Sequence, residues 1–313
     1  MDTTRLRVFR EVTRQGSFTA AADVLHISQP AVSQHVAKLE QELGCRLLER
    51  SSRRVRPTSA GEVFLRHVEP LLAGLDDARR ELAALTRSDC GQLRLTVFPS
   101  AVATFVASAV GAFRAAFPKV RTSLTEADPP IALARLLAGD TDLAVVYDYP
   151  LVGAPVDPRF DQTLIVADSM AVAVRADSMF AAHGSVPLAA LSGQEWIAPG
   201  PSMCRDALNE ACRRTGFGPN VVSETNDYQA MLGLVEAGVG VAVVPRLVGA
   251  IARSRSIALV PLAATRLERI VSVACRSGSA LTPAMEFMRS MLCGALAGQH
   301  TEVREVEAPA LSV

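Results

Sequence analysis

Residues 17–40, SFTAAADVLHISQPAVSQHVAKLE, decide how the chain begins to fold. Ser17 and Ser28 each precede a short run with helical spacing, and Ser is a favoured residue at a helix N-cap. Pro30 falls in the first turn of the second run, where its missing N–H leaves no bond unmade. The stretch therefore predicts two short helices joined by a tight turn at residues 26–27.

Each of the two predicted helices has an apolar face. Phe18 and the alanines after it form this face in the first helix, and Val32, Val36 and Leu39 form it in the second. We expect Ile27, in the turn, to lie in their shared core. Helices joined in this way form a helix-turn-helix, whose second helix enters the DNA major groove. The alternative is an ordinary amphipathic helix pair with a solvated outer face.

The outer face of the second helix has the chemistry of DNA contacts. Gln presents a donor and an acceptor to an adenine edge, Ser bonds either way, and Lys holds phosphates. The side chains predicted to face outward are Gln29, Ser33, Gln34, His35 and Lys38.

A basic segment follows the two helices. Residues 45–58, CRLLERSSRRVRPT, are typical of a short hairpin, and four arginines lie near its tip: Arg50, Arg53, Arg54 and Arg56. Residues 1–58 carry 10 Lys and Arg against 6 Asp and Glu, whereas the whole chain carries 32 of each. We therefore expect a basic wing that contacts the DNA backbone beside the groove.

Composition limits the class of protein. The 313 residues are 49% hydrophobic, which indicates two or three folded domains. We find neither an uninterrupted apolar run of 18 residues nor the apolar core of a signal peptide near Met1. The six cysteines contain no CxxC pair, so we expect reduced thiols in a cytoplasmic protein without a disulfide framework.

A long helix is predicted after the hairpin. Residues 59–62, SAGE, form a candidate capping box, and apolar spacing continues to residue 87. Such a helix would be roughly 43 Å long, with a bend at Pro70. Its apolar stripe predicts dimerisation with a second copy; the alternative is a helix folded back on its own domain.

From residue 91 the pattern alternates between strands, such as residues 120–126, and helices. Repeated βαβ units predict parallel sheets covered on both faces. We expect two such sheets, with the chain passing to the second near residue 167 and returning near 265. Residues 163–167 and 170–175 are predicted to form a hairpin, and residues 299–313 a disordered tail.

Over essentially its whole length the chain resembles LysR-type transcriptional regulators. The resemblance is specific in residues 16–22 (GSFTAAA), 28–33 (SQPAVS), 39–44 (LEQELG), 47–50 (LLER) and 57–61 (PTSAG), and looser in 136–144 and 237–245. It implies a winged helix-turn-helix over 1–58, a dimerising linker helix over 59–88 and an α/β effector-binding domain over 91–298. That domain would have two Rossmann-like lobes similar to periplasmic binding proteins: lobe I, residues 91–166 plus 268–298, and lobe II, residues 167–265.

The resemblance also implies partners and roles. The expected partners are promoter DNA, a small-molecule effector and further copies of the chain, as a homodimer or homotetramer. The implied base contacts are Gln29, Pro30, Ser33 and Gln34, and the implied backbone contacts are Ser28, His35, Lys38, Arg50, Arg53 and Arg54.

An effector site is predicted from topology. Ligands of open α/β sheets bind at the carboxyl ends of the strands, near helix N-termini. The residues this selects are Ser100, Asp128, Pro129 and Asp148 in one lobe and Pro199, Ser202, Cys204, Thr225 and Asn226 in the other. Four acids near this mouth, Glu126, Asp128, Asp148 and Asp227, favour a ligand with an amine, such as an amino acid. Alternatively, these acids only cap helices.

The sequence leaves two other functions to consider. Cys204 and Cys212 suggest a redox sensor, since peroxide sensors of this family use a cysteine pair in a comparable region. Eight helical residues would hold these thiols roughly 12 Å apart, beyond disulfide reach unless the helix unravels. An enzyme is disfavoured because no nucleotide-binding, hydrolase or metalloprotease motif is present and the five histidines lack metal-ligand spacing. A solute-binding protein is disfavoured by the predicted helix-turn-helix and the missing signal peptide. We expect no cofactor and no metal.

Overall fold

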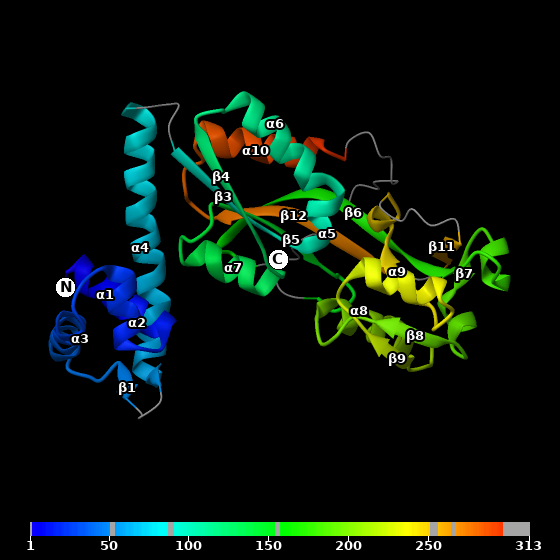
Figure 1. The fold of residues 1–313 in the computed structure, drawn as a ribbon, viewed down its shortest axis with the longest axis horizontal. Helices are drawn as coiled ribbons and strands as arrows, with labels where there is room; N and C mark the ends of the chain where they lie inside the picture. Colours follow the sequence, from blue (N-terminus) through cyan, green and yellow to red (C-terminus); the bar gives the residue numbers. More distant parts are fainter. Residues whose placement is uncertain are drawn as a thin grey trace, which may run out of the picture.

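The computed structural model describes residues 2–50, 54–86, 91–153, 157–250, 256–263 and 267–296. A small helical N-terminal domain leads into one long helix, α4, and an α/β part lies on the other side of that helix (Figure 1). The predicted tail 299–313 lies outside the described residues, as does the wing tip 51–53, which includes Arg53.

The N-terminal domain has the predicted helix-turn-helix. Its helices are α1 (Thr3–Gln15), α2 (Phe18–Leu25) and α3 (Gln29–Leu43). The hydroxyl of Ser17 accepts from the Ala20 amide at 3.3 Å, and that of Ser28 accepts from the Ala31 amide at 3.4 Å, so both predicted N-caps are confirmed. The strands β1 (Leu48–Arg50) and β2 (Val55–Pro57) pair antiparallel and form the wing.

The turn between α2 and α3 differs from the prediction in one residue. His26 adopts a left-handed backbone conformation, φ 54°, and the Ile27 amide bonds back to the carbonyl of Ala22. This closure places Leu25 against the core and leaves Ile27 38% exposed. The expectation that Ile27 lies in the core is therefore wrong.

Helix α4 spans Ser59–Thr86 and continues through Pro70. Its cap is Thr58, not a box between Ser59 and Glu62. The Thr58 hydroxyl accepts from the Gly61 amide at 3.0 Å and donates to the carbonyl of Arg46 at 2.8 Å. Because one hydroxyl serves both partners, it ties the start of α4 to the segment that enters the wing.

The first half of the α/β part is built on three parallel strands. These are β4 (Val120–Glu126), β3 (Gly91–Val97) and β5 (Leu143–Asp148), followed in the sheet by β12 (Glu268–Arg276) and β6 (Phe160–Arg175), which run antiparallel to their neighbours. Helices α6 (Ala107–Ala116) and α10 (Pro283–Gly294) cover one face, and α7 (Pro129–Leu137) covers the other (Figure 1).

A continuous helical segment, residues 99–116, precedes β4. It comprises α5 (Pro99–Ala101), a π-helical turn (Val102–Val106) and α6. By length and composition alone this segment could cross a membrane. Its side chains Phe105, Val106 and Phe113 are buried in the same core as the strands, so it is a core helix of the α/β fold.

The second half is built around the far end of β6. There β10 (Ala242–Pro245) and β11 (Ile257–Ala263) pair with β6 antiparallel, and β7 (Val186–Pro187) follows β11. The parallel pair β8 (Glu195–Ala198) and β9 (Asn220–Glu224) connects to β10 through a bridge between Trp196 and Val241. Two longer helices, α8 (Met203–Arg214) and α9 (Tyr228–Glu236), and three 3-10 helices, Met179–Ala182, Leu188–Leu191 and Arg246–Ala250, complete it.

Two predictions for this region are wrong. The hairpin expected at 163–167 and 170–175 is one 16-residue strand, β6, because Asp168 pairs with Arg269 across the sheet and does not form a turn. The sheets are mixed and not parallel, because β6 and β12 run antiparallel at the crossing between the lobes. The two lobes thus share a hydrogen-bonded path through β6.

Candidate functional site

Helix α3 has one buried and one exposed face. Val32, Val36 and Leu39 are fully buried in the N-terminal core. On the opposite side Ser28, Gln29, Pro30, Gln34 and Lys38 are exposed, and Ser33 and His35 are half-buried. The Gln29 amide donates to the Ser33 hydroxyl at 3.1 Å, one turn along the helix. The structure thus presents all seven predicted side chains of this helix at or near the surface.

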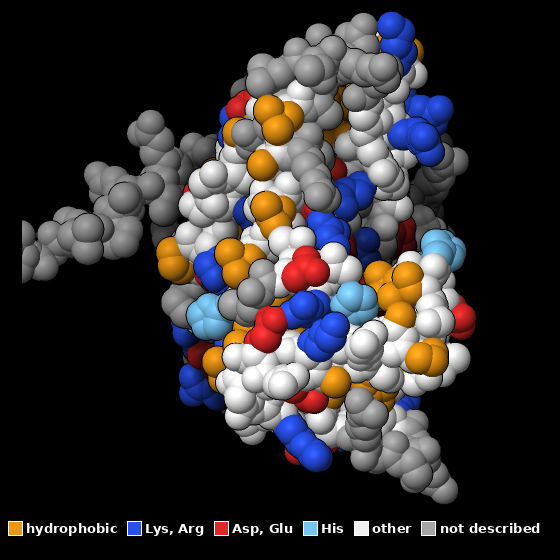
Figure 2. Space-filling view, turned by 90° about the vertical axis from the view of Figure 1, so that its left-hand side faces the viewer, with side chains coloured by type: hydrophobic (Ala, Val, Ile, Leu, Met, Phe, Trp, Pro, Cys, Tyr) orange, Lys and Arg blue, Asp and Glu red, His pale blue; other side chains and the backbone are white. Residues whose placement is uncertain are grey.

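The wing carries the remaining basic residues predicted to face DNA. Arg54 is exposed; the side chain of Arg50 and all of Arg53 lie outside what the structure describes. Seen from the side of this domain, Lys, Arg and His side chains lie on its surface (Figure 2). This surface combines polar side chains on a helix with nearby basic residues, the arrangement that DNA contacts require.

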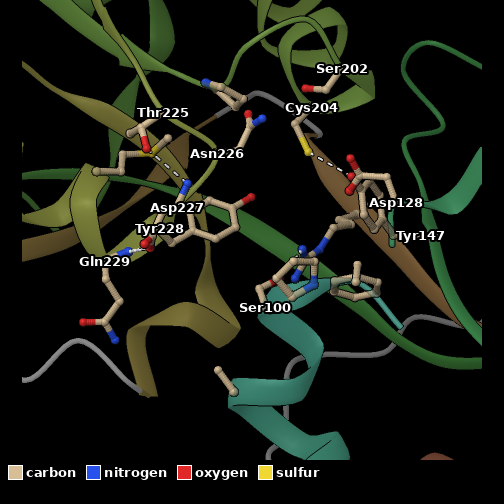
Figure 3. A pocket seen from close by; sticks show the side chains of 16 residues that line it. Ser100, Asp128, Tyr147, Ser202, Cys204, Thr225, Asn226, Asp227, Tyr228 and Gln229 are labelled. Carbon is tan, nitrogen blue, oxygen red and sulfur yellow. Dashed lines mark hydrogen bonds between the residues drawn. The ribbon is translucent and has the colours of Figure 1, made fainter. Parts of the chain in front are cut away.

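A second site lies between the two lobes of the α/β part. It is a cavity of about 470 Å³ at the carboxyl ends of the strands. Seven of the nine predicted residues line it: Ser100, Asp128, Pro199, Ser202, Cys204, Thr225 and Asn226. In Figure 3, Ser100, Asp128 and Tyr147 reach this space from one lobe, and Ser202, Cys204 and Tyr228 reach it from the other.

The other two predicted residues do not line the cavity. Pro129 is buried at the start of α7. The Asp148 carboxylate accepts from the Tyr149 amide at 2.8 Å and so holds the end of β5. Among the four acids that favoured an amine, only Asp128 and Asp227 line the cavity.

Most polar side chains from lobe II already have partners in the loops. Ser202 caps α8 by accepting from the Arg205 amide, and Thr225 accepts from the Asp227 amide at 3.2 Å. The Asp227 carboxylate accepts from the Gln229 amide at 2.8 Å, so this acid caps α9, which was the alternative left open. The Asn226 side-chain oxygen accepts from the Gly200 amide, which leaves its NH2 group for a ligand.

The most consequential lining residue was not predicted. Arg269, on β12, is 2% exposed, and its Nη2 donates to Asp168 at 2.8 Å. Its Nη1 donates to the Ser100 hydroxyl at 3.2 Å, and its guanidinium lies 4.9 Å from the centre of the Phe98 ring. Burial raises the pKa of Asp168, while Arg269 opposes that shift. The sequence signals for this pair were an aspartate inside the apolar run of β6 and an arginine at the start of the apolar run of β12.

Cys204 lies in a cluster of phenols. The Tyr149 hydroxyl donates to its sulfur at 3.3 Å, and the Tyr147 hydroxyl lies 3.5 Å away. Burial raises the pKa of the Tyr147 phenol, which keeps it neutral. Cys212 lies on the same continuous helix, fully buried, and burial raises the pKa of its thiol to about 11. Both cysteines are free, and the raised pKa of Cys212 disfavours the reactive thiolate at that position.

Comparison with known proteins places both regions in one family. Residues 3–62 match the family model of bacterial regulatory helix-turn-helix proteins of the lysR family, and residues 86–296 match the LysR substrate binding domain. The regulator TfdS of Cupriavidus pinatubonensis is 34% identical over 81% of this chain and 85% of its own length. The uncharacterized regulator YnfL of Escherichia coli is 30% identical over 77% of this chain and 80% of its own length.

Solved structures agree in fold. A full-length OxyR variant from Pseudomonas aeruginosa superposes with a TM-score of 0.74 at 21% identity, covering 93% of this chain and 94% of that one. Full-length CbnR in complex with its target DNA superposes with a TM-score of 0.60 at 25% identity, covering 94% of this chain and all of that one. The chain belongs to the LysR family of DNA-binding transcriptional regulators, with a helix-turn-helix at its N-terminus and a two-lobed effector-binding domain after it.

Proposed function

We propose that this chain regulates transcription by reading promoter DNA with α3 while a small molecule in the interlobe cavity modulates that binding. The observation that carries the first half is the exposed polar face of α3, opposite a fully buried apolar face. We assign base contacts to Gln29, Pro30, Ser33 and Gln34. We assign backbone contacts to Ser28, His35, Lys38, Arg50, Arg53 and Arg54.

The chain divides by role in the proposal. Residues 1–58 bind DNA, residues 59–88 link and dimerise, and residues 91–298 bind the effector. Lobe I comprises 91–166 plus 268–298, and lobe II comprises 167–265. The cavity supports this division because its lining comes from both lobes.

Dimerisation through α4 is part of the proposal. Val68 and Leu72 pack in the core of the N-terminal domain, so one face of α4 does lie on its own domain. Leu71, Leu75 and Leu82 are 59%, 44% and 64% exposed on the rest of the helix. Apolar side chains spaced along a long helix favour burial against a second helix. We therefore assign this stripe to contact with a second copy, with a homotetramer as the full assembly.

The role is regulatory and not enzymatic in this proposal. The similar proteins AlsR and TfdS are transcriptional regulators, and the polar groups of the cavity mostly cap helices and loops. Because its partner is promoter DNA, we also propose a cytoplasmic location.

Binding of the full chain to the DNA upstream of its own gene tests the proposal. The competitor is a scrambled duplex of equal length and composition at the same salt concentration, because phosphate contacts alone bind any sequence. We expect selective binding that weakens steeply as salt rises. Equal binding to both duplexes, together with no preference for any other intergenic region of the same genome over the scrambled duplex, would contradict the proposal.

A further inference from the structure

We propose that the cavity takes a zwitterion of the amino-acid class, with its carboxylate at Arg269 and Ser100 and its ammonium at Asp128. The inference rests on the proposed effector-binding role of the cavity and names the chemistry of the ligand. This chemistry is assigned from the charged and polar groups of the cavity that lack a partner among the described residues.

The acid end of the ligand is assigned by Arg269. A guanidinium has five N–H donors in a fixed planar fork, suited to a carboxylate. Two of its nitrogens have partners, Asp168 and Ser100, whereas the buried Nε lacks any partner among the described residues. A buried donor without an acceptor is unfavourable, so an incoming acid group gains from satisfying this fork.

Ser100 extends the same acid site. Its oxygen accepts from Arg269, which leaves its own proton free to donate to the ligand. Ser100 also lies in the first turn of the continuous helical segment 99–116, whose N-terminal amides and dipole favour an anion. The cation and the helix end therefore converge on one side of the cavity.

Charge balance assigns the ammonium end of the ligand to Asp128. Arg269 is already neutralised by Asp168, so a simple carboxylate would add a net negative charge beside Asp128. Asp128 is exposed at the N-terminus of α7, and its side chain makes no capping bond there. Asp227, by contrast, is already engaged as the cap of α9. Asp128 is thus the acid that can pair with an ammonium group.

The remaining walls fit an apolar side chain. Phe98, Tyr147, Tyr228 and Met231 line the cavity, and Tyr228 reaches toward its middle in Figure 3. A volume of about 470 Å³ falls in the ordinary range for small-ligand pockets. Aromatic faces also attract a nearby ammonium group. An amino acid with a large apolar or aromatic side chain therefore fits the acid site at Arg269 and Ser100, the carboxylate of Asp128 and the apolar walls.

Calorimetry with matched ligands tests the proposal. The twenty L-amino acids are titrated into the full chain, and the tightest binder is compared with its des-amino acid and its decarboxylated amine. For phenylalanine these are 3-phenylpropanoate and 2-phenylethylamine. We expect at least one amino acid to bind with a submillimolar Kd and both analogues to bind at least about 30-fold more weakly, the loss of one charged contact. No binding by any of the twenty, or equal binding by an analogue, would overturn the proposal.

Variants separate the two ends of the ligand. Asp128→Asn is expected to weaken binding of the amino acid at least tenfold. It should not weaken binding of the des-amino acid, because the variant no longer repels a simple carboxylate. Ser100→Ala is expected to weaken both carboxylate-bearing ligands alike. Asp148→Asn is the matched control, because its carboxylate lies outside the cavity. Equal losses for both ligands in Asp128→Asn would contradict the ammonium assignment. Selective binding of upstream DNA, measured in parallel, distinguishes failure of this inference from failure of the regulator role.

Discussion

The DNA-facing helix and the interlobe cavity are built in opposite ways. In α3 a single helix with its cap carries all seven predicted contacts, and helical spacing alone separates its exposed side chains from Val32, Val36 and Leu39. The cavity is lined by side chains from several strand ends and helix starts in two lobes. A surface made by one element can be derived from local periodicity, whereas a cavity made by many depends on how distant segments pair.

The largest difference between the two regions concerns buried charge. Asp168→Ala should cost about 3–5 kcal/mol, because it leaves Arg269 buried without its counter-ion. Urea denaturation followed by the fluorescence of Trp196, the single tryptophan, measures this loss in lobe II. Asp157→Ala is the control, since its pair with Arg159 is at the surface and should contribute little. Similar stability of Asp168→Ala and the control would contradict the structural role of the pair.

A second prediction separates the effector-cavity model from redox sensing. Burial raises the pKa of Cys212 from 9.0 to about 11, so its thiolate fraction at neutral pH falls about a hundredfold. Because the folded pKa is raised, the unfolded state loses this proton first. The contribution of Cys212 to the free energy of unfolding is therefore fully present below pH 9 and is lost as the pH rises from 9 through about 11. Alkylation by iodoacetamide, read by mass spectrometry, should be far slower at Cys212 than at the exposed Cys45.

Fast alkylation of Cys212 near neutral pH would count against this picture. The redox hypothesis would then gain support if peroxide altered DNA binding in the wild type but not in Cys204→Ser. An unchanged response in both the Cys204→Ser and the Cys212→Ser variants would rule it out.

The variant Gln29→Ala tests the base contacts proposed for α3. Loss of a side chain that contacts a base edge should weaken binding to upstream DNA by about 1–3 kcal/mol and leave scrambled DNA unaffected. Arg54→Ala, the backbone-contact control, should weaken both duplexes alike and reduce the salt dependence. Equal losses on the two duplexes for Gln29→Ala would sink its assignment as a base contact.

The smallest expected effect concerns the start of α2. Ser17→Ala should lower the free energy of unfolding of the N-terminal domain by about 1 kcal/mol, because the Ala20 amide loses its acceptor. Ser17→Gly should cost only a few tenths of that, since Gly is tolerated at an N-cap. Thermal unfolding followed by helical circular dichroism compares the two. A larger loss for Gly than for Ala would show that the cap does not act as described.

Local chemistry explains what could be predicted from the sequence. The caps at Ser17 and Ser28, the buried face of α3 and the bounds of β4 all follow from spacing and propensity within one segment. The turn was less predictable, because the left-handed conformation of His26 decided whether Leu25 or Ile27 faces the core.

Long-range pairing explains what could not. The predicted hairpin leaves Asp168 and Ser169 for its turn, and both residue types favour turns. Arg269, the partner of Asp168, lies 101 residues later, and only the register of β6 against β12 brings the two together. The same register places Arg269 at the cavity, so the strongest candidate for binding an acid group was missed with it.

Hydrogen–deuterium exchange of the full chain with and without its upstream DNA tests the central claim most directly. The account predicts slowed exchange in α3 and the strands of the wing on DNA binding, with little direct protection of the segments that line the cavity. Protection confined to the cavity segments, with α3 unchanged at saturating DNA, would contradict the division of roles between these two regions.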